Sequence, residues 1–173
     1  TVGVVNDLIR ACLTSGKDNH RAAYIAPFYS QAKAIAWDYA KFYSAPIPGI
    51  RINESELRID YPNGSRLRLF GADNYDAMRG LYLDDAALDE PADFPPNAWP
   101  MVIRPALADR QGRATFMGTP KGKNQFWEIH DHARSDPDWF SMVLKASQTG
   151  ILPQDEAIAA IKHAVEKTYG RKG

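Results

Sequence analysis

The sequence predicts an α/β fold in which helices cover both faces of a mostly parallel sheet. Short apolar segments of strand length alternate with segments whose apolar residues recur at helical spacing. The strand segments are continuously apolar, which is typical of strands buried on both faces. The chain has 173 residues, of which 45% are hydrophobic and 24% charged, as expected for one globular domain.

The first part of the chain predicts a helix, a strand and a crossover helix. Apolar residues recur at helical spacing from Val2 to Leu13. A short buried strand is expected over Ala22–Ala26, and Pro27 ends it. Helical spacing returns over Gln31–Tyr43 before a segment rich in proline and glycine ends that helix.

A β-hairpin is expected next. Residues 56–60 and 65–70 alternate between apolar and polar side chains around the turn sequence Pro62-Asn63-Gly64. Leucine and isoleucine share one face of the hairpin. The opposite face carries Arg58, Arg66 and Arg68, which we interpret as a solvated face.

The second part continues the alternation of strands and helices. Residues 73–80 predict a loop or short helix, and strand-like segments follow at 81–83 and 86–88. The remaining elements are expected in the order helix 95–107, strand 113–117, helix 125–133, strand 139–144 and helix 155–167.

Composition excludes several classes of protein. The single cysteine, Cys12, excludes an internal disulfide and a metal site built from several thiolates, and we expect it in the core. No apolar segment approaches the roughly 20 residues of a membrane helix, and no signal-peptide pattern opens the chain, so a soluble intracellular protein is expected. Basic and acidic residues balance at 21 each, so net charge neither requires nor forbids a nucleic-acid partner.

An acidic pair follows the apolar segment at 86–88. The end of a core strand in an ATPase supplies one carboxylate that holds Mg²⁺ and a second that orients or deprotonates the attacking water. Asp89 and Glu90 have the chemistry for both roles, and Thr119 is expected at the same carboxyl edge of the sheet. Taken alone, such a pair more often begins a surface turn, since Pro91 follows.

Several motifs, in the same order, resemble the ATPase domain of the large terminase subunit, the motor that packages DNA into the heads of tailed phages. They are YIAPFYSQAK at Tyr24–Lys33, GADNYDAMRGLYLDDAALDEPADFPPNAW at Gly71–Trp99 and MGTPKGKNQFW at Met117–Trp127. The resemblance covers nearly the whole chain. It implies a RecA-like P-loop NTPase fold of the ASCE branch, here without its N-terminal strand and P-loop.

The resemblance also implies roles for the acidic pair and for Thr119. Asp89 matches the Walker B aspartate that holds Mg²⁺, and Glu90 matches the catalytic carboxylate that positions water. Thr119 matches the family's coupling residue, although Gly118-Thr119-Pro120 could also be ordinary strand punctuation. The strand before Asp89 reads Ala-Ala-Leu, which departs from the family's bulky aliphatic pattern and leaves its burial to be tested.

Arg79 matches a family arginine that reaches into the active site of a neighbouring subunit. Such a residue neutralises the charge that develops on the γ-phosphate. The alternative interpretation is a surface arginine, or a structural partner for Asp73 or Asp76.

A P-loop of the form G-x-x-x-x-G-K-[ST] occurs nowhere in the sequence. The first expected helix begins at the first residues, and a helix of this kind follows a P-loop. We therefore expect Thr1 to be the last residue of that motif, with a hydroxyl that binds Mg²⁺ and the nucleotide. A strand and the glycine loop with its lysine are expected just upstream, and a nuclease domain downstream, so that residues 1–173 form a single partial ATPase domain.

Positive charge concentrates around the strand at 113–117. Arg113, Lys121 and Lys123 are the candidate DNA-binding residues, with Arg104 and Arg110 nearby. A DNA motor needs such charges to contact the phosphate backbone without reading bases. Each residue alone could equally belong to a solvated rim.

The leading hypothesis is an ATP-hydrolysing motor that drives double-stranded DNA into the procapsid, with ATP and Mg²⁺ as cofactors. The expected partners are duplex DNA, the portal protein, the small terminase subunit and further copies of the chain in a ring, all in the host cytoplasm. ATPase activity is expected of the intact protein, and the missing P-loop leaves the activity of these residues open.

Two alternatives stay open. An inactive domain could dock on DNA or portal, and the carboxylates Asp84, Asp85, Asp89, Glu90 and Asp93 could form a two-metal nuclease site. Residues two apart on a helix point to different sides, so His130 and His132 are assigned no shared metal site. His20 and His163 are isolated in the sequence and are also assigned no site.

Overall fold

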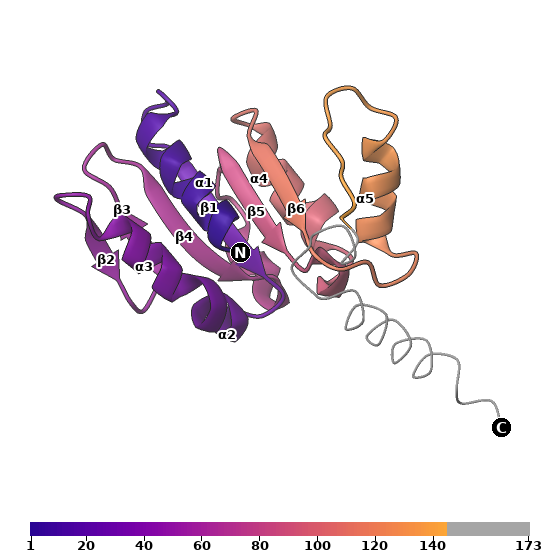
Figure 1. Cartoon of the computed structure of the whole chain (residues 1–173), viewed down its shortest axis with the longest axis horizontal. Helices are drawn as coiled ribbons and strands as arrows, with labels where there is room; N and C mark the ends of the chain where they lie inside the picture. The colour runs from indigo at the N-terminus through magenta and orange to yellow at the C-terminus, as the bar shows by residue number, and fades with distance from the viewer. Residues whose placement is uncertain (145–173) are drawn as a thin grey trace. The chain divides into compact units, whose positions relative to one another are not determined.

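The computed structural model describes residues 1–144, which belong to two compact units, Thr1–Ile129 and His130–Gly173. The first unit contains a six-stranded sheet in the order β2-β3-β4-β1-β5-β6 (Figure 1). The four parallel strands are β1 (Arg21–Ala26), β4 (Arg66–Gly71), β5 (Asp85–Asp89) and β6 (Arg113–Met117). Two short strands, β2 (Arg51–Asn53) and β3 (Arg58–Asp60), add an antiparallel edge. The predicted, mostly parallel sheet is confirmed.

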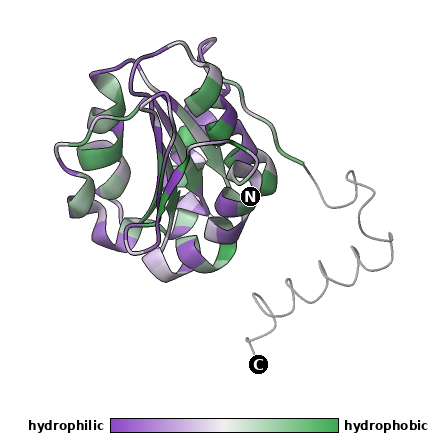
Figure 2. Cartoon of the chain, turned by 90° about the vertical axis from the view of Figure 1, so that its left-hand side faces the viewer, coloured by the Kyte–Doolittle hydropathy of each residue, from purple (hydrophilic) through white to green (hydrophobic). Residues whose placement is uncertain are grey.

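Helices cover both faces of this sheet (Figure 2). One face packs against α1 (Val2–Thr14) and the helical run α2 (Tyr29–Ala32), η1 (Lys33–Trp37) and α3 (Asp38–Ser44). The other face packs against η4 (Trp99–Ile103) and α4 (Arg104–Ala108). The remaining helical segments are η2 (Ala72–Met78), η3 (Pro91–Asp93) and α5 (Gln125–Ala133).

The neighbouring strands β1 and β5 are rich in alanine. In β5, Ala86, Ala87 and Leu88 are at most 1% exposed, so the departure from a bulky aliphatic pattern does not prevent burial. Small side chains let helices on both faces approach the sheet closely. Cys12 of α1 is fully buried in the same core, as predicted.

Two strands expected from the sequence are absent, and one observed strand was not predicted. Residues 81–83 form no strand, because the Leu83 N–H donates to the Ala106 carbonyl of α4 at 2.7 Å and not to a strand. Residues 139–144 also form no strand, and Phe140 and Leu144 are exposed, whereas a strand needs a neighbour to pair with. The sequence did not predict β2, which has three residues and lies at the edge of the sheet.

The described residues of the second unit, 130–144, contain the end of α5 and an irregular segment. His130 Nδ1 lies 2.6 Å from Ser141 Oγ, and His132 Nε2 lies 3.2 Å from an Asp136 carboxylate oxygen. The predicted helix 155–167 lies outside the described residues. Within residues 1–144, no helix has the length and apolar character needed to cross a membrane.

Candidate active site

Polar residues follow β5 and β6 where these two neighbouring strands end. Asp89 is the last residue of β5 and pairs in register with Met117, the last residue of β6. Glu90 and Thr119 come directly after these ends. The carboxyl ends of parallel strands form the usual ligand-binding edge of such a sheet, so these three side chains lie where the sequence analysis expected them.

The carboxylate of Asp89 accepts two hydrogen bonds from hydroxyl groups. The Thr1 hydroxyl, at the start of α1, donates to Asp89 Oδ2 at 3.2 Å. The Tyr24 hydroxyl, from β1, donates a short hydrogen bond to the same oxygen. Thr1 and Asp89 are 88 residues apart in sequence, and the structure brings them together.

Tyr24 is a member of this site that the sequence analysis did not identify. Its ring is fully buried in the core, and burial, together with the hydrogen bond to Asp89, raises the pKa of its phenol far above the usual value. The phenol therefore stays protonated and acts as a donor that fixes the carboxylate. One signal was present in the sequence, because a tyrosine in a strand as apolar as Ala22–Ala26 needs a partner for its hydroxyl.

The oxygens around Asp89 are of the kind that Mg²⁺ prefers. Mg²⁺ is usually held by one or two carboxylates and by substrate phosphates, and it keeps several of its waters. Within the described residues, no group of three or more His, Cys, Asp or Glu side chains could hold a metal ion without help from a ligand. The Asp89 carboxylate and the Thr1 hydroxyl supply two oxygens of this kind.

Glu90 has a left-handed backbone conformation, with φ of 51° and ψ of 50°. This conformation is uncommon for a residue other than glycine and is often found at functional sites. The Glu90 N–H donates to the Met117 carbonyl at 2.8 Å. The chain therefore turns sharply after β5, and the Glu90 side chain lies beside the end of β6.

Thr119 fixes the Glu90 carboxylate. Its backbone N–H donates to Glu90 Oε2 at 3.2 Å, and its hydroxyl lies 3.5 Å from Oε1. The chain passes Glu90 closely at Gly118, where a Cβ atom would lie only 3.0 Å from the Glu90 Cα. The Gly118-Thr119 segment thus determines where the second carboxylate of the acidic pair lies.

Arg79 forms an ion pair within its own segment. Its Nε lies 2.6 Å from Asp76 Oδ1, and both side chains are more than half exposed. Arg79 borders a surface hollow along η4 and α4, together with Met101 and Pro105, and neither Asp89 nor Glu90 lines that hollow. This contact with Asp76 was the alternative interpretation of Arg79.

The three candidate DNA-binding residues do not form one surface. Arg113 begins β6, at the opposite end of the strand from Lys121 and Lys123. Arg113 forms ion pairs of 2.6 Å with Asp7 and with Asp85.

The two lysines also have partners. Lys121 pairs with Asp93 at 2.5 Å, and the Lys123 ammonium lies 5.4 Å from the centroid of the Trp127 ring. Among the residues that the structure describes, Arg113 and Lys121 are therefore already neutralised by carboxylates.

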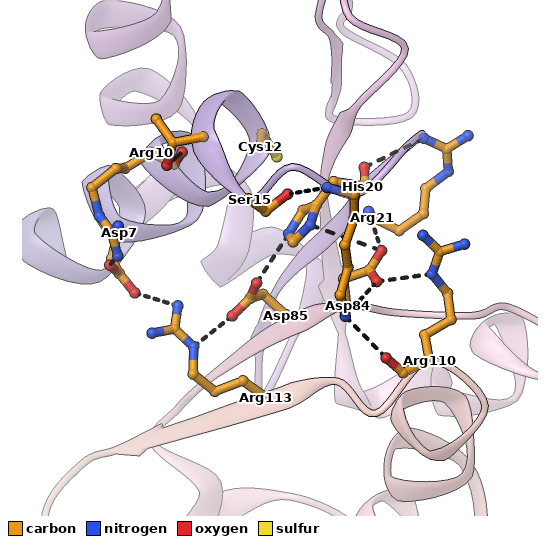
Figure 3. Close-up of polar contacts among 12 residues, drawn as sticks. Asp7, Arg10, Cys12, Ser15, His20, Arg21, Asp84, Asp85, Arg110 and Arg113 are labelled. Atoms are coloured by element: carbon orange, nitrogen blue, oxygen red, sulfur yellow. Dashed lines mark hydrogen bonds and ion pairs between the residues drawn. The ribbon is translucent and has the colours of Figure 1, made fainter.

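A buried polar network occupies the amino end of β5, away from Asp89 (Figure 3). Asp84 has a side chain with no exposed area and accepts from the Arg21 N–H at 2.9 Å and from Arg110 Nε at 2.8 Å. His20, which is 2% exposed, places Nε2 3.0 Å from Asp85 Oδ2. His20 is isolated in the sequence, but the structure surrounds it with residues that are distant in sequence.

The carboxylates considered for a nuclease site are divided by the length of a strand. Asp84 and Asp85 lie at the start of β5, whereas Asp89 and Glu90 lie at its end. Four residues of a strand span about 13 Å, which is too far for carboxylates to share a pair of metal ions about 4 Å apart. Asp93 is paired with Lys121. The five carboxylates therefore do not converge on one site.

Comparison with known proteins gives a consistent set of relatives, although no protein-family model matches the chain. The large terminase subunit of Escherichia phage T5 is 30% identical over 130 residues, which are 72% of this chain and 30% of that protein. The large terminase subunit of Thermus phage G20c is 44% identical over 65 residues, which are 38% of this chain and 13% of that protein. The chain thus spans less than a third of the length of these curated relatives.

Solved structures show the same fold. The large terminase of bacteriophage HK97 matches with a TM-score of 0.75 at 17% identity, over 97% of this chain and 42% of that chain. The ATPase domain of the large terminase of Thermus phage P74-26 matches with a TM-score of 0.60 at 26% identity, over 75% of this chain and 60% of that chain. The large terminase of a thermophilic bacteriophage, solved in complex with ADP, matches with a TM-score of 0.61 at 12% identity, over 92% of this chain and 39% of that chain. The fold is therefore the RecA-like fold of these ATPase domains.

Proposed function

Because this chain belongs to the phage large terminase family, as part of its ATPase domain, we propose that it hydrolyses ATP to drive double-stranded DNA into a procapsid. One observation carries the proposal. Asp89 and Glu90 end β5 as adjacent carboxylates, each fixed by different donors, at the carboxyl edge of a mostly parallel sheet. A motor of this class needs one carboxylate for the metal and another for water at that place.

Asp89 and Thr1 are the residues that would hold Mg²⁺. The metal would supply charge neutralisation for the β- and γ-phosphates of ATP. Tyr24 donates to Asp89 Oδ2, so it limits the orientations that the carboxylate can adopt. The first carboxylate is thus positioned before nucleotide arrives, which removes part of the cost of organising the site.

Glu90 is proposed to orient the attacking water and accept its proton. It is suited to this role because its carboxylate is held by the Thr119 N–H and not by a cation of the described chain. Thr119 is proposed as the coupling residue, since it connects the Glu90 carboxylate to β6. A change at the γ-phosphate could then move β6 through a single side chain.

The phosphate loop itself is proposed to lie upstream of Thr1, since the sequence contains no G-x-x-x-x-G-K-[ST] motif. The contact between Thr1 and Asp89 supports this assignment, because the hydroxyl that ends a P-loop and the Walker B carboxylate share one Mg²⁺. A nuclease domain is proposed downstream. Both assignments agree with a chain that covers only 30% of its phage T5 relative.

Arg79 is proposed to act on the active site of a neighbouring subunit in a ring. It would have to leave Asp76, and both side chains are exposed enough for that exchange. The test mixes Arg79→Ala and Glu90→Ala subunits of the full-length protein. If Arg79 acts in trans, mixed rings contain some intact sites and regain ATPase activity. Absence of recovery would contradict a trans role.

Portal protein, the small terminase subunit and duplex DNA are the proposed partners, in the host cytoplasm. The docking-module alternative keeps these partners and removes the chemistry. The separation of Asp85 from Asp89 along β5 disfavours the nuclease alternative for the described residues.

The deciding experiment measures Mg-ATP turnover by the full-length subunit, with and without duplex DNA. Glu90→Ala should lower kcat at least about 100-fold, which is the usual contribution of a general base. Asp93→Ala is the matched control, since it removes a carboxylate three residues away that pairs with Lys121. Turnover by Asp93→Ala should stay within about threefold of wild type, because an exposed ion pair contributes little.

Each result has a defined meaning. Loss in Glu90→Ala alone supports the motor and identifies the catalytic carboxylate. No Mg-ATP turnover in the wild-type protein would favour the docking module. Thr119→Ala with both ATP hydrolysis and DNA movement intact would remove the coupling role.

A further inference from the structure

Two rows of arginine side chains cross one face of the sheet, away from the proposed ATP site. The register of the strands aligns Arg21 of β1 with Arg66 of β4, and Arg66 with Asp60 of β3, which in turn pairs with Arg51 of β2. In the next row of the same face, Arg68 lies directly opposite Arg58. We call this surface the arginine face, and its members are Arg21, Arg51, Arg58, Arg66 and Arg68.

The alternation of side chains along the strands places these arginines on one face. The intervening residues Ile59, Leu67 and Leu69 are buried in the core beneath α1 and α3. The arginines therefore point to the opposite face. Farther along that face, Ile25 and Phe70 pack in the core that includes residues of η4 and α4. Toward β2, charged side chains take the place of this apolar packing.

The carboxylates of this surface do not neutralise its arginines. Arg58 pairs with Glu56 and also with Asp60 at 3.1 Å, and Arg66 pairs with the same Asp60 at 2.6 Å. Two carboxylates therefore serve a surface with five arginines. Arg51 is exposed and forms no ion pair with any residue that the structure describes.

Arg68 of this face also forms no ion pair with a described carboxylate. Its Nε is buried and has no hydrogen-bond partner within residues 1–144. Its guanidinium carbon lies 5.0 Å from the centroid of the Phe70 ring, and this stacking leaves the in-plane donors of the guanidinium unused. Like charges directly opposite each other on neighbouring strands are destabilising, so Arg58 and Arg68 would both gain from a shared anion.

The spacing of the rows fits a polyanion. From β1 to β2 there are three strand spacings, or about 14 Å, and the two rows are about 7 Å apart. One strand of duplex DNA carries a phosphate about every 3.4 Å along its axis, so this surface could contact about four phosphates of one strand. Part of the surface is recessed, because Arg51, Arg58 and Arg66 line a hollow of about 450 Å³ together with Asp60.

We propose that the arginine face binds the phosphate backbone of duplex DNA, which rests on the proposed packaging function. Arginine forks match phosphate oxygens bidentately, and backbone contacts need no base sequence, as a packaging motor requires. This assignment differs from the one made on sequence, where Arg113, Lys121 and Lys123 were the candidates. Arg113 and Lys121 are occupied by carboxylates, whereas Arg51 and Arg68 are not.

The test measures binding of a short fluorescein-labelled duplex to the full-length subunit by anisotropy, as a function of NaCl concentration. The double variant Arg51→Ala/Arg68→Ala removes the two arginines that have no carboxylate partner. The logarithm of the binding constant falls with the logarithm of salt with a slope of about −0.9 per phosphate contact, so the slope should become shallower by about 1.8. With equal affinities of wild type and variant at 1 M NaCl, this difference in slope makes the variant bind the duplex about 60-fold more weakly than wild type at 0.1 M NaCl.

Two further double variants serve as controls. Lys121→Ala/Lys123→Ala removes the same charge from another surface, and its duplex binding should stay within about threefold of wild type because Lys121 is already paired with Asp93. Arg51→Lys/Arg68→Lys keeps the charge and should retain most of the salt slope, which separates loss of charge from loss of folding. Mg-ATP turnover without DNA should be unchanged in Arg51→Ala/Arg68→Ala, since neither residue contacts the proposed ATP site.

Four outcomes would overturn the proposal. Duplex binding within twofold of wild type in Arg51→Ala/Arg68→Ala, with ATP turnover intact, rejects the arginine face and leaves the motor. A loss confined to Lys121→Ala/Lys123→Ala moves the DNA contact to the end of β6. Binding of polyglutamate but not of duplex DNA identifies an acidic protein partner. A wild-type subunit with neither Glu90-dependent turnover nor DNA binding rejects the proposed function together with this inference.

Discussion

Asp84→Ala should lower the free energy of unfolding of this chain by about 3 kcal/mol, because it removes a buried charge that holds several segments together. The Asp84 side chain has no exposed area. It accepts from the Arg21 N–H at 2.9 Å and from Arg110 Nε at 2.8 Å, and Lys17 Nζ lies 3.3 Å away. One carboxylate therefore connects β1, the loop before it and the segment between α4 and β6.

The magnitude follows from the exposure of the partners. Hydrogen bonds to a charged group contribute about 1.5–3 kcal/mol each, and removing one partner of a buried pair costs about 3–5 kcal/mol. The side chains of Lys17 and Arg110 are 43% and 30% exposed, so both cations can turn to water when the carboxylate is lost. The Arg21 N–H has less freedom to do so. The lower end of the range, about 3 kcal/mol, is expected, with a fall in Tm of about 6–12 °C.

The assay is urea unfolding of the chain followed by circular dichroism, with Asp93→Ala as the matched control. The Asp93→Ala variant also removes a carboxylate that pairs with a lysine. The Asp93 side chain is 41% exposed, so its removal should lower the free energy of unfolding by at most about 1 kcal/mol. If the two variants differ by less than about 1 kcal/mol, burial does not control the effect, and the argument from exposure is wrong.

The same variant predicts a pH dependence. Burial tends to raise the pKa of Asp84, but the hydrogen bonds from Arg110, Arg21 and Lys17 outweigh it and hold that pKa below its usual value. A carboxyl with a lowered folded pKa stabilises the protein above its unfolded pKa of about 3.9, and that stability is lost as the pH falls through the folded value. The difference between wild type and Asp84→Ala should be constant between about pH 5 and 8 and should shrink below about pH 4.

Three further predictions concern single residues near the sheet. Gly118→Ala places a Cβ 3.0 Å from the Glu90 Cα. A resulting shift of Glu90 by about 0.5 Å should lower kcat of the full-length subunit about 10-fold. An unchanged kcat at unchanged Tm would contradict this prediction. Tyr24→Phe removes the hydrogen bond to Asp89 and should cost about 1.5–3 kcal/mol in denaturant unfolding, and a loss below about 0.5 kcal/mol would show that the bond is dispensable. Burial raises the pKa of the Cys12 thiol to about 12, so Cys12 should react with a disulfide reagent at pH 8 only in the unfolded chain, and rapid reaction of the folded chain would count against its burial.

Local sequence was enough to predict the elements that form the proposed ATP site. The strand at 86–88 ends in Asp89 and Glu90 and is followed by the helix at η4–α4 and the strand β6, all of which the apolar pattern indicated. Such patterns depend on residues a few positions apart, and a parallel sheet brings strand ends to a common edge. The local pattern alone could not distinguish Asp89, Glu90 and Thr119 from turn residues, and the resemblance to a family then implied functional roles for them.

Partners that come from distant segments could not be predicted in this way. Tyr24 donates a hydrogen bond to Asp89, which is 65 positions away in the sequence, and His20 contacts Asp85 at a similar separation. Nothing in the local sequence around Tyr24 or His20 identifies these partners. The prediction of a strand at 139–144 was wrong for the same reason, because an apolar segment does not indicate whether a neighbouring strand is available to pair with it.

The sequence by itself determined the alternation of strands and helices, the acidic pair at a strand end and the alternating faces of the hairpin. Each of these features depends only on residues that lie close together in the sequence. Only the tertiary structure decided that Arg21 and Arg51 lie in one row with Arg66, because this depends on the order and register of four strands. Register is fixed by burying the opposite, apolar face, so charged residues acquire their neighbours as a consequence of the core.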